Sequence, residues 1–312
     1  MQTSSFEWTA DDGKRIVVHV FSPDSDGAPR AVVHVVHGMS EHGARYARVA
    51  EVLTASGFVV VAHDQRGHGK TATDDELGFF GSRDGWGRAL ADIRGLLAHT
   101  RTTYAGAPQA IIGHSMGSFL TQRIMSDEGP NLAAVVLSAT NGPPNALARS
   151  GVFVARAERA RLGDRGKSRL LQALSFDGFN RAFRPNRTAF DWLSRDDAEV
   201  DKYIADDRCG FAASASLWVQ LLEALPGLLA PDVLARIPKT LPVYVLAGAE
   251  DPVHDKTKNL KGLLSAYAQA GLSDVTYRAW PGARHEVFNE TNRAQVVAEM
   301  HDWLAQKIPA RQ

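Results

Sequence analysis

The pentapeptide GHSMG at residues 113–117 decides the fold of this chain. Residues 109–112 precede it with a strand pattern, and residues 119–125 follow it with helical spacing. A serine flanked by two glycines between a strand and a helix is typical of a sharp turn that exposes the serine side chain. Both glycines are needed because the backbone is strained and closely approached there. The pattern predicts that Ser115 is a nucleophile at the N-terminus of a helix.

A serine nucleophile needs a base, because its hydroxyl reacts poorly until its proton is removed. In this type of turn the expected chain order is serine, then an acid, then histidine. Asp251 follows the apolar run 243–246, and His285 follows the run 275–277. Like Ser115, both lie just past strand ends, at the edge where open α/β sheets bind ligands. We therefore predict His285 as general base and Asp251 as the acid that orients it.

Other residues compete for these two roles. Glu250 and Asp255 flank Asp251, and a shift of one residue at the strand end would exchange Glu250 with Asp251. His254 and His301 are alternatives to the predicted base. His301 falls inside an expected C-terminal helix, which is a poor position for a base. Glu250 is thus the closest rival.

The oxyanion of the tetrahedral intermediate needs two backbone N–H donors. In this strand order one donor follows the nucleophile, and the other lies in the loop after an earlier strand. That loop begins His37-Gly38-Met39, directly after the apolar run 31–36. We predict that the oxyanion hole is formed by the backbone N–H groups of Met39 and Met116. Losing one such donor typically costs about 2.7–4 kcal/mol.

Short apolar runs alternate with segments of helical spacing along most of the chain. Continuous hydrophobicity predicts strands buried on both faces, as in a parallel sheet. The runs are residues 17–21, 31–36, 58–62, 110–112, 133–137, 243–246 and 275–277. The helical segments are residues 47–55, 86–100, 118–127, 258–270 and 291–308. The alternation predicts an α/β protein with a doubly wound, mostly parallel sheet. The turn at 11–13 predicts an antiparallel start.

The alternation breaks between residues 142 and 237, where we find no convincing strand. Helical patches separated by prolines occupy this stretch, at residues 169–174, 197–204 and 213–225. Such a long stretch inside a series of strands and helices predicts an insertion over one edge of the sheet. We therefore divide the chain into a core, residues 1–141 and 238–312, and an inserted helical cap, residues 142–237.

Composition excludes several classes of protein. Lys plus Arg and Asp plus Glu both number 35, so zero net charge predicts no nucleic-acid partner. The single cysteine, Cys209, excludes an internal disulfide. No apolar run approaches the roughly 18 residues that cross a bilayer, and the first residues lack a signal-peptide pattern. We expect a soluble, cytoplasmic protein.

One segment has part of a nucleotide-binding pattern. Residues 67–71 read GHGKT, but the full phosphate-binding loop needs glycine where this chain has Asp64. His34, His37 and His42 lie close in sequence, yet no H-E-x-x-H or C-x-x-C spacing occurs. We therefore predict no nucleotide, no metal and no other cofactor.

Taken together, these motifs resemble the monoacylglycerol lipase and lysophospholipase branch of the α/β-hydrolases. The shared segments are HGMSEH at 37–42 with RY at 45–46, DQRGHG at 64–69, GHSMG at 113–117, DPV at 251–253 and RHE at 284–286. The resemblance implies an α/β-hydrolase fold, catalytic Ser115, Asp251 and His285, the same oxyanion hole, and a helical cap over the site. It also implies that the loop at 64–69 is structural.

The expected activity is hydrolysis of carboxylic esters through an acyl-enzyme on Ser115, with a small-molecule ester as substrate. The resemblance favours lipid-like monoesters, either monoacylglycerols or lysophospholipids. A small-ester carboxylesterase, another acyl hydrolase of this fold and a non-catalytic ligand-binding protein remain the alternatives. Six basic and two acidic residues at 156–169 suggest transient contact with an anionic membrane, although a solvated helix face is the simpler interpretation.

Overall fold

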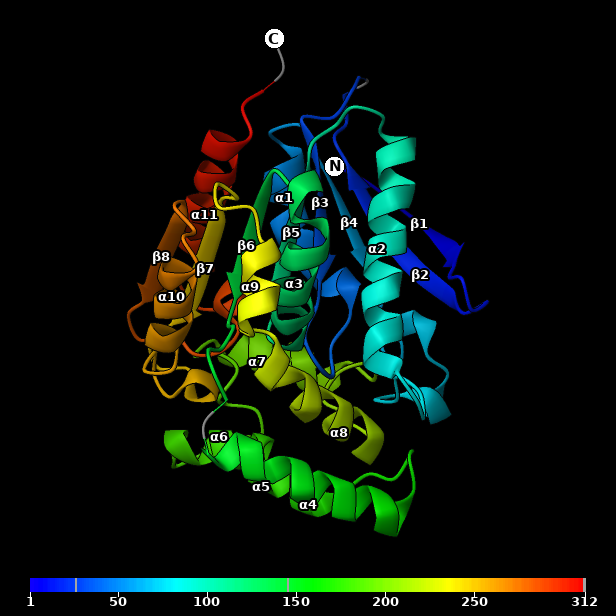
Figure 1. Ribbon diagram of the computed structural model, residues 1–312, viewed down its shortest axis with the longest axis vertical. Helices are drawn as coiled ribbons and strands as arrows, with labels where there is room; N and C mark the ends of the chain where they lie inside the picture. Colours follow the sequence, from blue (N-terminus) through cyan, green and yellow to red (C-terminus); the bar gives the residue numbers. More distant parts are fainter. Residues whose placement is uncertain (26, 145, 311–312) are drawn as a thin grey trace.

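A mixed β-sheet runs through the middle of the molecule and carries helices on both faces (Figure 1). The computed structural model describes residues 1–25, 27–144 and 146–310. Within these residues eight strands form one sheet, in the order β1-β2-β4-β3-β5-β6-β7-β8. The strands are β1 (Gln2–Thr9), β2 (Arg15–Ser22), β3 (Ala31–Val36), β4 (Phe58–His63), β5 (Gln109–His114), β6 (Ala134–Ser138), β7 (Val243–Gly248) and β8 (Val275–Trp280).

The strand directions agree with the prediction of a mostly parallel sheet. From β4 to β8 all neighbours pair in parallel, whereas β2 pairs antiparallel with both β1 and β4. Every residue of β3, β4, β5, β6 and β7 is buried, as their continuous apolar sequences predict. No apolar run indicated β1, because its residues are almost all exposed; its pairing with β2 places it at the sheet edge.

Two layers of helices bury the two faces of the sheet. The helices of the predicted core are α1 (Ala47–Thr54), α2 (Gly85–Thr103), α3 (Met116–Glu128), α10 (Leu260–Gln269) and α11 (Arg293–Lys307). In Figure 1, α2, α3 and α10 cover the near face, and α1 and α11 cover the far face. One apolar cluster joins Leu97, Leu120 and Leu263 to the near face, and another joins Leu53 and Leu304 to the far face. The sheet is thus the middle of three layers.

The described part of residues 142–237 is helical and contains no strand. Its helices are α4 (Ala146–Leu162), α5 (Arg169–Leu174), α6 (Phe176–Asn180), α7 (Asp197–Ala205), α8 (Ala215–Ala224) and α9 (Pro231–Arg236). In Figure 1, α4 to α8 lie beyond the carboxyl ends of the parallel strands, and α9 lies beside α3. The division into core and cap stays a prediction, and we use the word cap for residues 142–237.

None of the helices in the described ranges is long and apolar enough to cross a membrane. The predicted cytoplasmic location stays a prediction.

Candidate active site

Ser115 occupies the turn between β5 and α3. Its backbone has φ 50° and ψ −119°, a combination that only a strongly constrained non-glycine residue adopts. The Ser115 N–H donates to the carbonyl oxygen of Ser138 at 3.0 Å, which ties the turn to the end of β6. The strained turn therefore presents the serine side chain at the carboxyl edge of the sheet, as the sequence pattern predicts.

Close backbone contacts explain the glycine at position 117. A Cβ atom there would collide with the carbonyl oxygen of Val36 at the end of β3. The backbone of α3 therefore starts directly against β3, and only glycine fits. This contact also brings the loop after β3 next to Ser115.

Ser115, His285 and Asp251 form one hydrogen-bonded chain. The Ser115 hydroxyl lies 3.0 Å from Nε2 of His285, and Nδ1 of His285 lies 2.8 Å from Oδ2 of Asp251. The side chains of His285 and Asp251 are 3% and 0% exposed. Asp251 follows β7 and His285 follows β8, so three strand ends bring together residues that are far apart in sequence. This is the geometry of a nucleophile, a base and an orienting acid.

Electrostatics match these roles. Burial works to lower the pKa of His285, but the charge and hydrogen bond of Asp251 outweigh it and raise that pKa above its ordinary value. Burial works in the opposite direction on Asp251, yet the imidazoles of His285 and His254 hold the pKa of its carboxyl far below the usual range. Asp251 is therefore ionised and stabilises a positive charge on His285.

The rival residues lie elsewhere. The Glu250 side chain is 42% exposed and forms an ion pair with Lys256 at 2.6 Å. His301 lies on α11 and bonds Ser56 and Asp302. Asp255 is exposed as well. His254 is buried, and its Nε2 lies 3.2 Å from Asp251 Oδ2, so it contacts the acid and not the nucleophile.

Met39 and Met116 flank Ser115. Met116 is the first residue of α3, where backbone N–H groups have no acceptor within the helix. Met39 follows Gly38, where a Cβ atom would lie 3.2 Å from the Cβ of Ser115. Met39, Ser115 and Met116 all line one cavity. The two residues of the predicted oxyanion hole thus lie beside Ser115, and their role as N–H donors stays a prediction.

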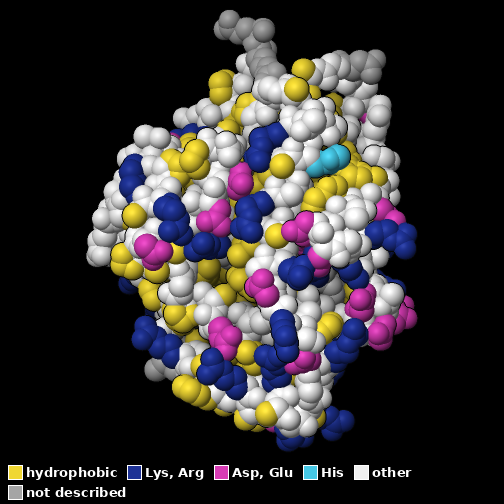
Figure 2. Space-filling view, turned by 45° about the vertical axis from the view of Figure 1, so that its right-hand side comes forward, with side chains coloured by type: hydrophobic (Ala, Val, Ile, Leu, Met, Phe, Trp, Pro, Cys, Tyr) yellow, Lys and Arg dark blue, Asp and Glu magenta, His cyan; other side chains and the backbone are white. Residues whose placement is uncertain are grey.

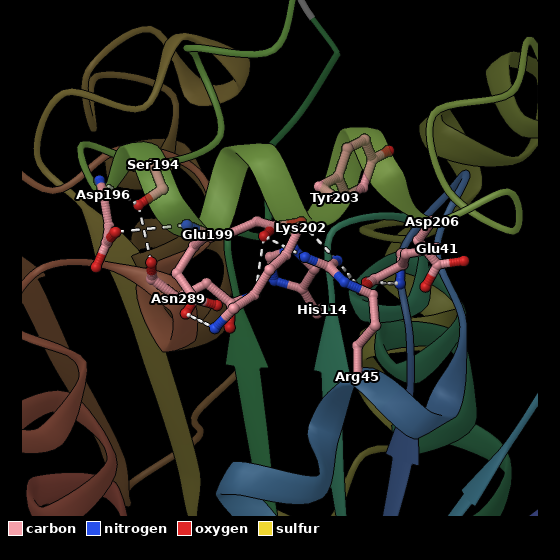
Figure 3. A network of polar contacts seen from close by, with 12 residues as sticks. Glu41, Arg45, His114, Ser194, Asp196, Glu199, Lys202, Tyr203, Asp206 and Asn289 are labelled. Carbon is pink, nitrogen blue, oxygen red and sulfur yellow. Dashed lines mark hydrogen bonds and ion pairs between the residues drawn. The ribbon is translucent and has the colours of Figure 1, made fainter.

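A buried ion-pair network supports the loop that carries Met39 (Figure 3). Glu41 accepts hydrogen bonds from the Gly38 N–H, from Tyr46 at 3.0 Å and from Arg45 at 2.7 Å. Arg45 also forms two hydrogen bonds of 2.7 Å to Glu286, the residue after His285. Burial works to raise the pKa of Glu286, but Arg45 lowers it to about 2. These residues belong to the sequence motifs at 37–46 and 284–286, but no local pattern predicted that they join the loop of Met39 to the loop of His285.

The cap is tied to the same loop. The carbonyl oxygen of Ser40 accepts hydrogen bonds from Tyr203 Oη at 2.8 Å and from Gly210 N–H at 3.0 Å, and its hydroxyl donates to the Phe211 carbonyl at 2.7 Å. Arg45 of the core lies over the ring of Tyr203, 4.9 Å from its centroid. Both side chains are labelled in Figure 3. Cap residues therefore help to hold the segment next to Met39.

An apolar cavity of about 250 Å³ opens beside Ser115. Met39, Met116 and Phe119 of the core form part of its wall. Most of its wall comes from the cap: Ala148, Gly151, Val154, Leu171, Leu174, Phe176, Phe179, Trp192, Trp218, Leu221, Leu222 and Leu225. Trp192 also lies against the imidazole of His285, with ring centroids 4.8 Å apart. The nucleophile thus faces a mostly hydrophobic chamber.

Among the described residues, one group has ligand atoms close enough to hold a metal ion: His42, Asp206 and Cys209, all within 4.8 Å of one another. Nε2 of His42 is already bonded to Asp206 at 2.8 Å. Burial raises the pKa of the Cys209 thiol, so the thiolate that binds metals is disfavoured. The trio bridges core and cap, and it lies outside the hydrogen-bonded chain of Ser115.

Asp64 stands where a phosphate-binding loop needs glycine, and it is fully buried. Its carboxylate accepts hydrogen bonds from the N–H groups of Gly43 and Lys70, both at 2.8 Å, and contacts His19 at 3.2 Å. The carboxylate thus joins the loop of Gly43 to the loop of Lys70. A phosphate bound by this loop would meet the negative charge of Asp64.

Comparison with known proteins identifies the family. A family model described as serine aminopeptidase, S33, matches residues 27–292. The chain belongs to this family. The S33 assignment agrees with the strained Ser115 turn and the α/β-hydrolase fold, and it makes the protein a serine hydrolase.

The similarity of this S33 member to its relatives extends over nearly the whole chain. The monoacylglycerol lipase of Mycolicibacterium smegmatis is 27% identical over 300 residues, covering 95% of both chains. The monoglyceride lipase of Homo sapiens is 26% identical over 307 residues, covering 95% of this chain and 88% of its own. The crystal structure of a carboxyl esterase from Bacillus coagulans has a TM-score of 0.89 at 24% identity and covers 99% of both chains, which shows the shared fold.

Proposed function

We propose that this protein hydrolyses monoacylglycerols, with Ser115 as nucleophile, His285 as general base and Asp251 as its orienting acid. The relatives named as monoacylglycerol and monoglyceride lipases, similar over 95% of this chain, support the reaction class. The apolar cavity beside Ser115 supports a lipid acyl group. The core supplies the reacting residues, and the cap supplies most of the acyl-binding wall.

The reaction starts with proton transfer from Ser115 to Nε2 of His285, across the 3.0 Å contact. The serine oxygen attacks the ester carbonyl, and the N–H groups of Met39 and Met116 bind the oxyanion that forms. The imidazolium of His285 is stabilised by Asp251 and returns its proton to the glycerol oxygen as that alcohol leaves. Water, activated by the same histidine, then hydrolyses the acyl-enzyme and releases the fatty acid.

The single observation that carries the lipid assignment is the composition of the cavity wall. Peptide substrates, which the family description suggests, present amide N–H and C=O groups that lose hydrogen bonds with water in such a site. An acyl chain loses none, and each buried methylene contributes about 0.8 kcal/mol. A small-ester hydrolase has no need for a chamber walled by cap helices. A non-catalytic binder has no need for the chain from Ser115 to Asp251.

The decisive experiment combines a fluorophosphonate probe with a series of esters. The probe should label Ser115 and no other serine; a label elsewhere, or none on folded protein, contradicts the acyl-enzyme. kcat/KM should rise by up to about fourfold per added methylene until the cavity is filled, and monoacylglycerols should be preferred over triacylglycerols. Ser115→Ala is the control. A maximum at acetate or butyrate would retain the serine hydrolase and reject the lipid substrate.

We also propose that the cap makes transient contact with membrane surfaces, where monoacylglycerols reside. Most charges of the basic stretch are paired, for example Arg156 with Glu223 and Arg161 with Glu158. On the face shown in Figure 2, basic and acidic side chains are interspersed. Phe153 on α4 is 68% exposed, however, so apolar side chains are better placed to insert into lipid.

Binding to phosphatidylglycerol vesicles tests this contact. Phe153→Ser should lower vesicle binding more than the triple alanine variant of Arg156, Arg159 and Arg161, with stability unchanged in both. Wild-type binding by Phe153→Ser would reject insertion, and a larger loss in the arginine variant would favour electrostatic adsorption.

A further inference from the structure

His254 is a buried histidine that the reaction described above does not use. It lies three residues after Asp251, and both side chains are 0% exposed. Its Nε2 lies 3.2 Å from Oδ2 of Asp251, the same oxygen that bonds His285. Despite this short distance, the nitrogen has no hydrogen-bond partner within the described residues. A polar atom without solvent and with a single neighbour needs an explanation.

The other ring nitrogen shows which tautomer is present. The backbone N–H of Thr257 donates to Nδ1 of His254 at 2.9 Å. A nitrogen that accepts a hydrogen bond carries a lone pair, so the ring proton must be on Nε2. That proton then lies beside the Asp251 carboxylate, 3.2 Å from nitrogen to Oδ2, and acts on its charge without forming a hydrogen bond.

The chain adopts an unfavourable conformation to make this contact. Asp255, Lys256 and Thr257 all have positive φ, at 50°, 50° and 74°. Left-handed backbone is unfavourable for these residues, most of all for β-branched threonine. The bend is what returns the Thr257 N–H to the His254 ring, and strain of this kind concentrates at functional sites.

We propose that His254 is a positioning residue for the triad: its Nε2–H and the Val253 N–H hold the Asp251 carboxylate in the orientation that serves His285. The Val253 N–H donates to Oδ1 at 2.9 Å, and His254 and His285 share Oδ2. Two hydrogen-bond donors, Val253 and His285, and the nearby Nε2–H of His254 thus surround a carboxylate that is fully buried. This role rests on the proposed catalytic function of Ser115, His285 and Asp251.

The effect on the base has a definite sign. Removing one donor from Oδ2 leaves more negative charge to act on His285, so the pKa of His285 rises. Catalysis needs neutral His285, and activity is lost as the pH falls through that pKa. The acidic limb of kcat/KM should therefore move to higher pH. The other titratable groups that face His285 are His114, Glu286 and Glu41, and the substitution leaves them in place.

Two measurements test the proposal. In nitrogen-15 spectra of the wild-type protein, the His254 ring should show the Nε2–H tautomer; the Nδ1–H tautomer would overturn the proposal. His254→Leu should shift the acidic limb of the kcat/KM profile by about half a pH unit to higher pH. It should also lower kcat by about tenfold, which is a small part of the roughly 10⁴-fold effect of neutralising an orienting acid.

His254→Gln and Lys256→Ala are the matched variants. Glutamine supplies an N–H and a carbonyl at similar reach, so its limb should stay close to that of the wild type. Lys256 is exposed on the same bend, and its alanine variant should be unaffected. A lower kcat in His254→Leu without a limb shift, or no rescue by glutamine, would indicate a merely structural residue and overturn the proposal. The wild-type tautomer does not depend on activity, so failure of the proposed function would show separately, as turnover by Ser115→Ala.

Discussion

Replacing Asp251 by asparagine removes one charge and changes little in shape. In the structure its Oδ2 lies 2.8 Å from Nδ1 of His285, with the centres of the two charges somewhat farther apart. Unit charges about 4 Å apart interact by about 4 kcal/mol at an effective dielectric constant near 20, which corresponds to about 10³ in rate. The amide also favours the wrong tautomer of His285, which raises the expected loss in kcat to about 10⁴.

The pH dependence of Asp251→Asn should change as well. Asp251 is the main cause of the raised pKa of His285, so its neutralisation should lower that pKa and move the acidic limb of kcat/KM to lower pH. The assay is kcat/KM for a p-nitrophenyl ester across pH, with circular dichroism to check folding. Glu250→Gln is the control, because the Glu250 side chain is half-buried and pairs with Lys256 instead of His285. A residual activity within tenfold of wild type, or a larger loss in Glu250→Gln, would refute the assignment of the acid.

Three further outcomes are expected. Dialysis against EDTA should leave turnover unchanged, and a loss restored by zinc would contradict a metal-free mechanism. Gly117→Ala should prevent correct folding or abolish probe labelling, because its Cβ would meet the Val36 carbonyl; labelling at the wild-type rate would refute this. Arg45→Met leaves Glu286 buried without its partner and should lower the free energy of unfolding by about 3–5 kcal/mol in urea titrations, where an unchanged midpoint would count against it.

Much of the core could be predicted because local patterns determine it. Continuous apolar runs mark the strands that are buried on both faces, and the glycine pattern around Ser115 places a strained turn between strand and helix. Strand β1 was not predicted, because an edge strand with exposed side chains has no apolar run. Its position follows from its pairing with β2. The helix α4 escaped as well, since its basic residues obscure a regular apolar face.

The site shows the same limit. Strand ends predict that Ser115, Asp251 and His285 share one edge, but distances of 2.8 and 3.0 Å depend on the path of each loop. The sequence could not decide whether Glu250 or Asp251 is the orienting acid, because the direction of a side chain changes with every residue along the chain. The pair of Arg45 and Glu286 joins positions 241 residues apart, and no local pattern reports such a contact.

The hydrogen bonds between Ser40 and the cap affect how this enzyme can be re-engineered. Exchanging caps between relatives is an obvious way to change acyl preference. Here Tyr203, Gly210 and Phe211 form hydrogen bonds to Ser40, next to Met39. A graft that removes them would loosen the proposed oxyanion donor together with the proposed acyl-binding wall. A cap taken from a relative therefore has to supply equivalent hydrogen bonds to Ser40. Alternatively, the exchanged segment should end before residue 203. Otherwise the same exchange would change the acyl specificity and lower the turnover of the chimera at once.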